Sequence, residues 1–184
     1  MKIKIVTTIL LTFILIIFFD LFIYADDTIK PIYDIPLDWA LQDYTFEMSH
    51  RNGIEPELVL AIIEVESCYQ SDVVNDSGTC FGLMQINKKS HKELIEKVGC
   101  KDIFDERDNI IIGIGILKDL FNKYDKVEYV LMAYNGGEEY LQKQIKKGIS
   151  STSYTKKVLA VQERLNEQSK TDDKEITKSN KRQV

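Results

Sequence analysis

The sequence predicts a mainly α-helical domain. Several segments carry apolar residues at helical spacing, and two of them, within residues 56–66 and 105–124, are apolar nearly all round. Helices of that kind are normally buried at the centre of a domain. No run of any length alternates apolar and polar residues as a half-buried strand does. The 184 residues are enough for one domain with a proper core.

Residues 1–25 are expected to direct export and to lie outside the fold. Lys2 and Lys4 give the segment a positive start, and residues 5–19 are apolar apart from two threonines. The segment ends at Ala25, which fits the small-residue site that a signal peptidase cleaves. An exported protein that acts outside the cytoplasm is therefore expected.

A retained membrane anchor is the alternative for this segment, because residues 5–24 match the ~20 residues that span a bilayer. Positive charge before the apolar run and Asp26 and Asp27 after it place the domain outside the membrane on either interpretation. Residues 26–36 contain two prolines and no periodicity, which indicates a linker. The folded domain is then expected over residues 37–168.

The first helix is expected over residues 37–52, with Gly53 as its C-terminal stop. Its apolar residues form one stripe, as in an amphipathic helix. The stripe consists of Leu37, Ala40, Leu41, Tyr44 and Met48. Trp39 is expected to pack in the core or against a groove.

The second helix, residues 56–66, starts with Pro56, which suits a first helical turn. Its two late carboxylates, Glu64 and Glu66, point roughly 200° apart at about 100° per residue. The face of Glu66 is otherwise apolar and holds Val59, Ile62 and Ile63. Glu66 is therefore expected to be partly desolvated, which raises the pKa of a carboxyl group.

A loop is expected after this helix, because residues 67–80 are rich in Ser, Asp, Asn and Gly. Residues 90–98 follow as a short helix with Ser90 as its cap, Glu93 three residues later and Gly99 at its end. These residue types at this spacing are typical of a capping box.

The helix over residues 105–124 contains Gly113 and Gly115, which cost helix propensity by about 1 kcal/mol each. They are expected to permit close helix packing. Residues 127–134 form the next helix, which the glycines that follow Asn135 interrupt.

Helices over residues 138–146 and 151–168 complete the domain. Residues 169–184 are almost all polar or charged and cannot bury enough apolar surface to become ordered. They are predicted to be a disordered tail.

Export makes the three cysteines relevant, because disulfides persist outside the cell. Cys68 and Cys80 flank the polar loop, and a bridge between them would stabilise the fold by roughly 3 kcal/mol. A Cys80–Cys100 bridge is equally consistent with the cysteine count, and three free thiols also stay open.

Composition argues against several classes of function. The net charge is −5, whereas nucleic-acid binding favours a basic patch. The chain has two histidines, His50 and His91, and neither is spaced like a metal ligand. No Gly-rich phosphate loop is present in the sequence. No metal, cofactor or nucleic-acid partner is therefore expected.

Short blocks of the chain, in order and at plausible spacing, match the pattern of one enzyme family. They are Ala61-Ile62-Ile63-x-x-Glu66-Ser67, Gly82-Leu83-Met84-Gln85-Ile86, Asn109-Ile110-x-x-Gly113, Ala133-Tyr134-Asn135-Gly136-Gly137 and Ser153-Tyr154-Thr155-Lys156-Lys157-Val158. They resemble the soluble lytic transglycosylases, lysozyme-like enzymes that cut bacterial peptidoglycan and are related to goose-type lysozymes. The resemblance covers roughly residues 39–165.

The resemblance implies a lysozyme-like helical fold, with a small β-hairpin near residues 72–79. It implies cleavage of the bond between N-acetylmuramic acid and N-acetylglucosamine in peptidoglycan glycan strands. In this family one glutamate, matched here by Glu66, protonates the bridging oxygen and then accepts a proton from the muramyl C6 hydroxyl. That hydroxyl closes a 1,6-anhydro ring, so no water and no cofactor are consumed.

The resemblance also assigns a set of substrate-binding residues around the acid. Ser67 would position the sugar or the acid, and Tyr154 would lie near the acid. The remaining members would line the groove; they are Met84, Gln85, Tyr134 and Asn135.

Two alternatives stay open. Asp72 or Asp76 could activate a water, which would make the protein a hydrolytic muramidase. A non-catalytic exported scaffold of a secretion or conjugation apparatus in the cell envelope is the alternative from another class. The chain departs from the family at residues 87–89, where Asn-Lys-Lys replaces the common Pro-x-Thr and puts the local loop shape in doubt.

Overall fold

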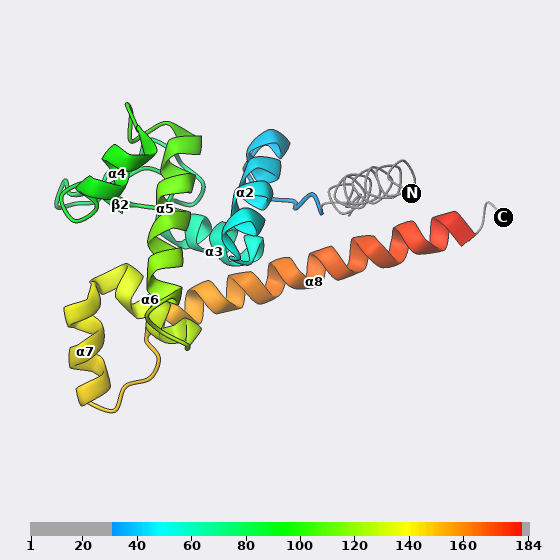
Figure 1. Ribbon diagram of the computed structural model, residues 1–184. Coiled ribbons are helices and arrows are strands. Elements are labelled where there is room, and N and C mark those ends of the chain that lie inside the picture. Colours follow the sequence, from blue (N-terminus) through cyan, green and yellow to red (C-terminus); the bar gives the residue numbers. More distant parts are fainter. Residues whose placement is uncertain (1–30, 182–184) are drawn as a thin grey trace, which may run out of the picture. The chain divides into compact units, whose positions relative to one another are not determined.

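The computed structural model describes residues 31–181, with side chains as far as residue 170. The predicted export segment, residues 1–25, lies outside the described residues. The described part contains seven helices and one two-stranded antiparallel hairpin, so the prediction of a mainly helical domain with a small hairpin is confirmed (Figure 1). Within residues 31–181, no helix combines the length and the apolarity that crossing a bilayer requires.

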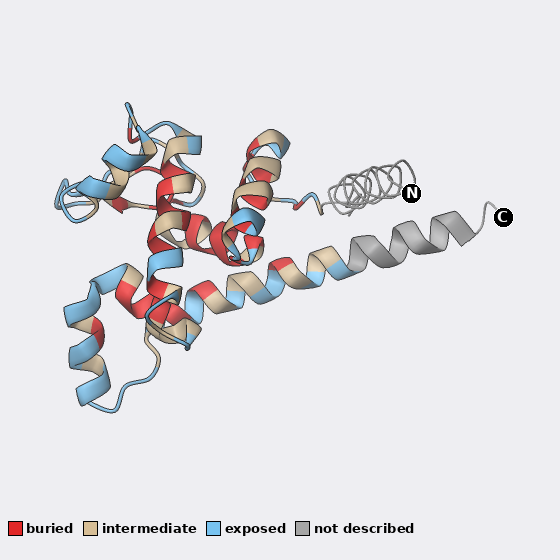
Figure 2. Cartoon of the chain, viewed as in Figure 1, coloured by how far each residue is buried: buried red, intermediate tan, exposed pale blue. Residues whose placement is uncertain are grey.

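Helix α3 (Pro56–Ser67) provides much of the core, as its sequence predicts. Every residue from Leu58 to Ile63 is buried, and Figure 2 shows the middle of this helix in the colour of buried residues. It packs against helices α2 and α8. Near its end, the residues from Glu64 to Glu66 are only half-buried, so the helix carries its two carboxylates out of the core.

Helix α5 (Glu106–Phe121) lies between α2, α4 and α6 and contacts all three (Figure 1). The expectation that its glycines permit close helix packing is confirmed for Gly115 and not for Gly113. A Cβ atom at Gly113 would lie 2.2 Å from the sulfur of Met84, and one at Gly115 would lie 3.1 Å from Leu94 of α4. The partner of Gly113 is thus a loop residue, Met84, and not a residue of another helix.

Helix α2 (Trp39–Asn52) begins after the N-cap Asp38 and ends at Gly53, close to the predicted bounds. Its buried face differs from the predicted stripe and includes polar residues. The buried residues are Leu41, Gln42, Thr45, Phe46 and Ser49. Burial of Gln42 is possible because its amide bonds the backbone of Tyr33 and Leu37.

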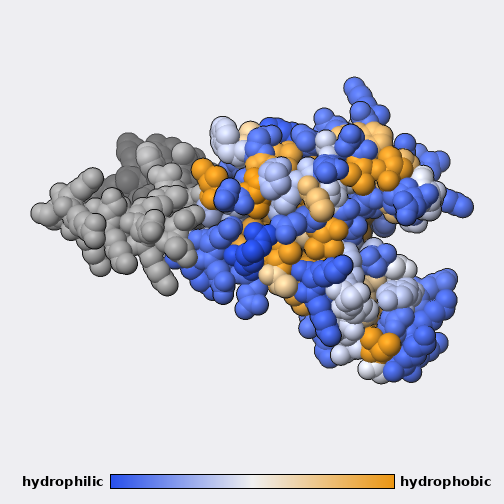
Figure 3. Space-filling view, turned by 180° about the vertical axis from the view of Figure 1, so that it is seen from behind, coloured by the Kyte–Doolittle hydropathy of each residue, from blue (hydrophilic) through white to orange (hydrophobic). Residues whose placement is uncertain are grey.

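Trp39 is 68% exposed, so the prediction that it packs in the core or a groove is wrong. It lies two positions before the buried Leu41, which at about 100° per residue puts it roughly 200° around α2 from that side chain. Seen from behind, hydrophilic residues cover most of the described surface, and hydrophobic residues form separate patches among them (Figure 3).

The hairpin joins β1 (Cys80–Phe81) to β2 (Ile86–Asn87), with Cys80 opposite Asn87. The sequence predicts a hairpin near residues 72–79, and the two strands lie just after that range. Within that range only Val74 pairs, through a bridge to Phe81. The preceding loop is closed instead by Asn75, whose Oδ1 accepts the backbone N–H groups of Thr79 and Cys80.

Helix α4 (Lys92–Val98) begins later than predicted, with His91 at the N-cap and no side-chain cap bond, so the predicted capping box does not form. The preceding turn is held by Asn87, which accepts the N–H of Ser90. Helices α6 (Val127–Gly136) and α7 (Glu138–Lys146) follow the prediction closely.

Helix α8 (Ser153–Lys181) packs on α3 and α6 and continues well beyond Gln168. The sequence predicts a disordered tail over residues 169–184, but the structure has helix as far as Lys181. The segment contains no Gly or Pro that would end a helix.

All three cysteines are free thiols, so the suggested Cys68–Cys80 bridge is not formed. Cys68 is exposed at the left-handed C-cap of α3. Cys80 lies on strand β1 and lines the cleft described below. The two thiols therefore occupy different surroundings, although they flank the same loop.

Candidate active site

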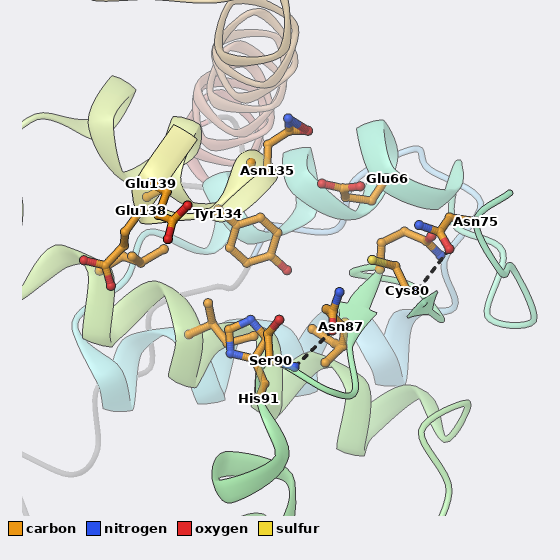
Figure 4. A pocket seen from close by; sticks show the side chains of 17 residues that line it. Glu66, Asn75, Cys80, Asn87, Ser90, His91, Tyr134, Asn135, Glu138 and Glu139 are labelled. Carbon is orange, nitrogen blue, oxygen red and sulfur yellow. Dashed lines mark hydrogen bonds between the residues drawn. The ribbon is translucent and has the colours of Figure 1, made fainter. Parts of the chain in front are cut away.

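A cleft of about 630 Å³ lies beside the C-terminal end of α3 (Figure 4). Its walls come from α3, the hairpin and the turn after it, α5, α6 and the start of α7. The polar and charged residues that line it are Glu66, Asn75, Gln85, Asn87, Ser90, His91, Tyr134, Asn135, Glu138 and Glu139. Segments that are distant in the sequence thus converge on Glu66.

Glu66 is half-buried in the last turn of α3, on the face that the sequence predicts. Burial raises the pKa of its carboxyl group, and a hydrogen bond from Tyr154 offsets part of that rise. The phenol of Tyr154 donates this bond to Oε1 over 2.6 Å. The raised pKa means that this carboxyl holds its proton to a higher pH than an exposed glutamate does.

Tyr154 lies on α8, 88 positions after Glu66 in the sequence, and its side chain reaches back to the end of α3. Burial first, and then the charge of Glu66, raise the pKa of its phenol far above its usual value. The phenol therefore stays protonated and acts as a donor at any working pH. It stabilises the charged form of Glu66 without exchanging its proton.

Tyr134 of α6 lines the cleft next to Glu66, and Figure 4 shows its ring between Glu66 and Glu138. Its hydroxyl donates to the backbone carbonyl of Met84 over 2.8 Å. Burial, and then the charge of Glu66, raise the pKa of this phenol well above its usual value. The bond fixes the ring against the turn that carries Gln85.

Gln85 lines the cleft in a left-handed backbone conformation, with φ of 49°. Its amide nitrogen donates to the carbonyl oxygens of Val73 and Gly82, over 3.1 and 3.0 Å. The side chain thus ties the loop before the hairpin to the turn within it. Asn135, at the end of α6, is exposed and lines the same cleft.

The turn that holds Gln85 rests on Asn109 of α5, which is fully buried. Its Oδ1 accepts the N–H of Met84 over 2.8 Å, and its Nδ2 donates to the carbonyls of Phe81 and Ile103, each over 2.9 Å. Gly82 has φ of 75°, and a Cβ atom there would lie 2.4 Å from this nitrogen. A glycine is therefore required at this position.

Two of the expected substrate-binding side chains do not reach the cleft. Met84 is fully buried against Gly113, so it lies in the core beneath the site and its side chain cannot touch a sugar. Ser67 is also buried, and its hydroxyl donates to the carbonyl of Ile63 in its own helix. Of the expected set, Glu66, Gln85, Tyr134 and Asn135 line the cleft, and Tyr154 touches Glu66.

The two candidate water-activating residues, Asp72 and Asp76, are exposed and do not line the cleft. Two carboxylates that the sequence analysis missed do so, Glu138 and Glu139. Glu138 accepts bonds from Lys123, over 2.6 Å, and from Tyr124, and these lower the pKa of its carboxyl. It is therefore ionised and paired at neutral pH.

The other missed residues are Asn75, Asn87, Ser90 and His91. Burial lowers the pKa of His91, and the charge of Asp119 offsets part of this. For Asn109 a signal did exist, because an asparagine in an otherwise apolar helix run needs hydrogen-bond partners. For the cleft-lining residues there was none, because their positions depend on turns that long-range contacts fix.

Glu64 faces away from the cleft, as its helical phase predicts. Its Oε2 accepts a bond from Tyr69 over 2.7 Å and pairs with Arg164 of α8. Cys68 and Tyr69 both have positive φ, of 50° and 65°. Glu64 therefore helps to hold the unusual backbone that ends α3, so it is structurally engaged.

Comparison with known proteins identifies a family and several relatives. The model of the family described as "Transglycosylase SLT domain" matches residues 43–156, more than half of the chain. A "Transglycosylase" of Enterobacteria phage PRD1 is 29% identical over 111 residues, which cover 60% of this chain and 38% of the relative. A "Membrane-bound lytic murein transglycosylase C" of Pectobacterium atrosepticum is 35% identical over 104 residues, covering 48% and 29%.

A "Peptidoglycan-binding-like protein" of Escherichia coli O157:H7 is 36% identical over 129 residues, covering 62% of this chain and 72% of the relative. The chain therefore spans well under half the length of the first two relatives. Two solved structures share the fold at 20% identity, covering 70% of this chain and 24% of each. They are an inactive mutant of the lytic transglycosylase Slt from Pseudomonas aeruginosa, with a TM-score of 0.60, and the 70 kDa soluble lytic transglycosylase from Escherichia coli, with 0.58.

Proposed function

We infer that this chain, which belongs to the Transglycosylase SLT domain family, is a peptidoglycan lytic transglycosylase. It cleaves the bond between N-acetylmuramic acid and N-acetylglucosamine and leaves a 1,6-anhydromuramyl end. One observation carries the proposal. Glu66 is a half-buried carboxyl of raised pKa that lines the cleft and accepts a bond from Tyr154.

Glu66 acts first as a general acid. Its proton passes to the bridging glycosidic oxygen, the bond from that oxygen to C1 of the muramyl residue breaks, and the N-acetylglucosamine end leaves as an alcohol. A raised pKa supports this step, because the acid must still hold its proton at working pH. As the proton leaves, the Tyr154 phenol stabilises the carboxylate that forms.

Glu66 then acts as the base. Its carboxylate accepts the proton of the muramyl C6 hydroxyl, and the hydroxyl oxygen forms a bond to C1. This closes the anhydro ring and restores the protonated acid, so atoms and charge balance without water. The positive charge that develops at C1 is met by the N-acetyl group of the same sugar.

The placement of the other carboxylates favours this route over hydrolysis. An inverting hydrolase needs a second carboxylate roughly 6.5–9.5 Å from the acid to activate a water. Asp72 and Asp76 do not line the cleft, and Glu138 is engaged by Lys123 and Tyr124. Glu139 is the remaining carboxylate of the cleft, and Figure 4 shows it beside Glu138, on the other side of the Tyr134 ring from Glu66. A hydrolytic muramidase would have to take its base from there.

Gln85, Tyr134 and Asn135 are proposed to hold the sugars, because their side chains line the cleft beside Glu66. Met84 and Ser67 are proposed to act indirectly. The carbonyl of Met84 orients Tyr134, and the buried hydroxyl of Ser67 bonds the end of the helix that carries Glu66. Tyr154 is proposed as the residue that tunes the acid.

Action on peptidoglycan places the protein outside the cytoplasm, which agrees with the export segment predicted over residues 1–25. We also propose that this segment anchors the protein to the membrane and that the enzyme acts together with a cell-envelope apparatus. The names of the relatives, one of them a membrane-bound murein transglycosylase, support this location. A purely non-catalytic scaffold gains no support from a cleft that retains Glu66.

Mass spectrometry of the products tests the proposal. Purified peptidoglycan digested by the exported protein should release muropeptides that end in 1,6-anhydro sugar, each lighter by one water than its hydrolysed counterpart. Reducing ends would instead establish a hydrolytic muramidase. If the folded wild type released neither product from purified wall, the enzyme proposal would be wrong and the scaffold alternative would stand.

A further inference from the structure

A second hollow, of about 650 Å³, adjoins the cleft and shares two lining residues with it, Ser90 and His91. We call it the basic pocket. Its lining residues are Lys89, Ser90, His91, Lys92, Glu93, Leu94, Lys97 and Asp119. The lining of the basic pocket thus contains three lysines and two carboxylates. In the part of the chain that the structure describes, the carboxylates that line the cleft are three glutamates, and no lysine or arginine lines it.

The junction between cleft and basic pocket is a built turn. Oδ1 of Asn87 accepts the backbone N–H of Lys89 over 3.1 Å and that of Ser90 over 3.0 Å. The carbonyl of Asn87 accepts the N–H of His91 over 3.1 Å. Figure 4 shows Asn87, Ser90 and His91 along the side of the cleft that faces Tyr134. The turn therefore holds Lys89 at the boundary between the two hollows.

The lysines of the basic pocket are not committed to strong internal pairs. Lys92 lies 3.8 Å from Glu96, and both side chains are mostly exposed. Pairs of this kind contribute about 0–1 kcal/mol and yield readily to a better partner. Of residues 87–89, where Asn-Lys-Lys departs from the family pattern, Lys89 lines the pocket. The departure thus supplies positive charge at the edge of the site.

We propose that the basic pocket binds a free carboxylate of the peptide stem on a sugar held in the cleft. This inference rests on the proposed function. In peptidoglycan the stem branches from the lactyl group of the muramyl residue and ends in carboxylates, so it extends sideways from a strand that lies in the cleft. Lysine ammonium groups are mobile point charges that suit a flexible anion. The preferred substrate is therefore peptidoglycan with unamidated stems.

Binding to the full chain carrying Glu66→Gln tests this without turnover. Calorimetry compares three ligands: a disaccharide with a free-carboxylate stem, the same compound with its stem amidated, and the bare disaccharide. The free stem should bind about five- to tenfold more tightly than the amidated one. Adding Lys89→Gln and Lys92→Gln should abolish this difference, while Lys146→Gln with Lys147→Gln, which removes two positive charges at the end of α7, should preserve it.

Equal affinity for free and amidated stems would overturn the proposal. So would a preference that survives loss of both lysines. Tighter, lysine-dependent binding of poly(glycerol phosphate), with no effect of stem amidation, would assign the pocket to a phosphate polymer and overturn it as well.

Kinetics separate this proposal from that of the enzyme. On wall with free stems, the double lysine variant should raise KM by about fivefold and leave kcat unchanged, and on peptide-free strands it should match the wild type. If the wild type cleaves wall but the double lysine variant has the same KM on wall with free stems, the basic-pocket proposal alone is refuted. Wild type that cleaves nothing, with the stem preference intact in calorimetry, refutes the activity and upholds the pocket.

Discussion

Tyr154→Phe tests the tuning of Glu66 directly, because it removes one hydroxyl and keeps the ring. The hydroxyl donates to Oε1 of Glu66 over 2.6 Å from a partly buried position. This bond favours the charged carboxylate and lowers the pKa of Glu66 against the larger effect of burial. Its loss therefore raises that pKa further and weakens the acid.

The size of the effect follows from the geometry. A hydrogen bond to a charged group contributes about 1.5–3 kcal/mol. Because Glu66 is half-buried, the lower end of that range applies. The carboxylate forms in the first step, so that step loses its stabilisation, whereas the second step uses a carboxylate that has become a stronger base. We expect kcat to fall about tenfold, which corresponds to ~1.4 kcal/mol.

The assay is the pH profile of anhydromuropeptide release from purified peptidoglycan. The limb that reports ionisation of Glu66 should move to higher pH in Tyr154→Phe, because the interaction that lowers its pKa is gone. Tyr129→Phe, on a half-buried tyrosine of α6, is the matched control and should change neither rate nor profile. A rate within twofold of wild type, or a limb that moves to lower pH, would refute the reasoning.

Three further predictions concern the acid, its support and the tail. Glu66→Gln should lower turnover at least about 10²-fold, with the exposed Glu163→Gln as control. At pH 7 it should also raise the free energy of unfolding, because the raised pKa of Glu66 makes its charge unfavourable there; denaturation at about pH 3 should show no such gain. Asn109→Ala should cost about 3 kcal/mol or more in urea unfolding, since three buried backbone groups lose partners, whereas exposed Asn122→Ala should cost little. Truncation after Gln168 should keep turnover within about tenfold, and a larger loss would give residues 169–184 a role.

Glu64 and Glu66 show what can be predicted from sequence at this site. Helical phase alone separated Glu66 from Glu64, because a helix of known bounds fixes the direction of each side chain. From sequence, Glu64 would be a natural control for Glu66. The structure makes it unsuitable, because Tyr69 and Arg164 both bond its carboxylate. Those partners come from a left-handed turn and a distant helix, which no periodicity reveals.

The errors share a physical cause. The resemblance puts Met84 in the groove, but its side chain fills the space that Gly113 leaves open on α5. Ser90 was expected to cap a helix, but the turn around it is held by the side chain of Asn87. In both cases a tertiary or turn contact, and not the local sequence pattern, determines where the side chain lies. The helices themselves were predictable because their burial follows from periodic apolar residues.

The position of Glu66 depends on how α8 docks against α3. Tyr154 and Arg164 lie ten residues apart on α8 and bond Glu66 and Glu64, on opposite sides of α3. The Arg164–Glu64 pair is partly exposed and contributes at most about 1 kcal/mol.

Two fully buried apolar residues of α8, Val158 and Leu165, contribute about 1.5–3 kcal/mol each. Apolar packing therefore supplies most of the docking energy, and the hydrogen bonds orient the helix. A change that loosens Val158 should thus impair catalysis before it unfolds the domain, because the phenol that tunes the acid lies one turn away.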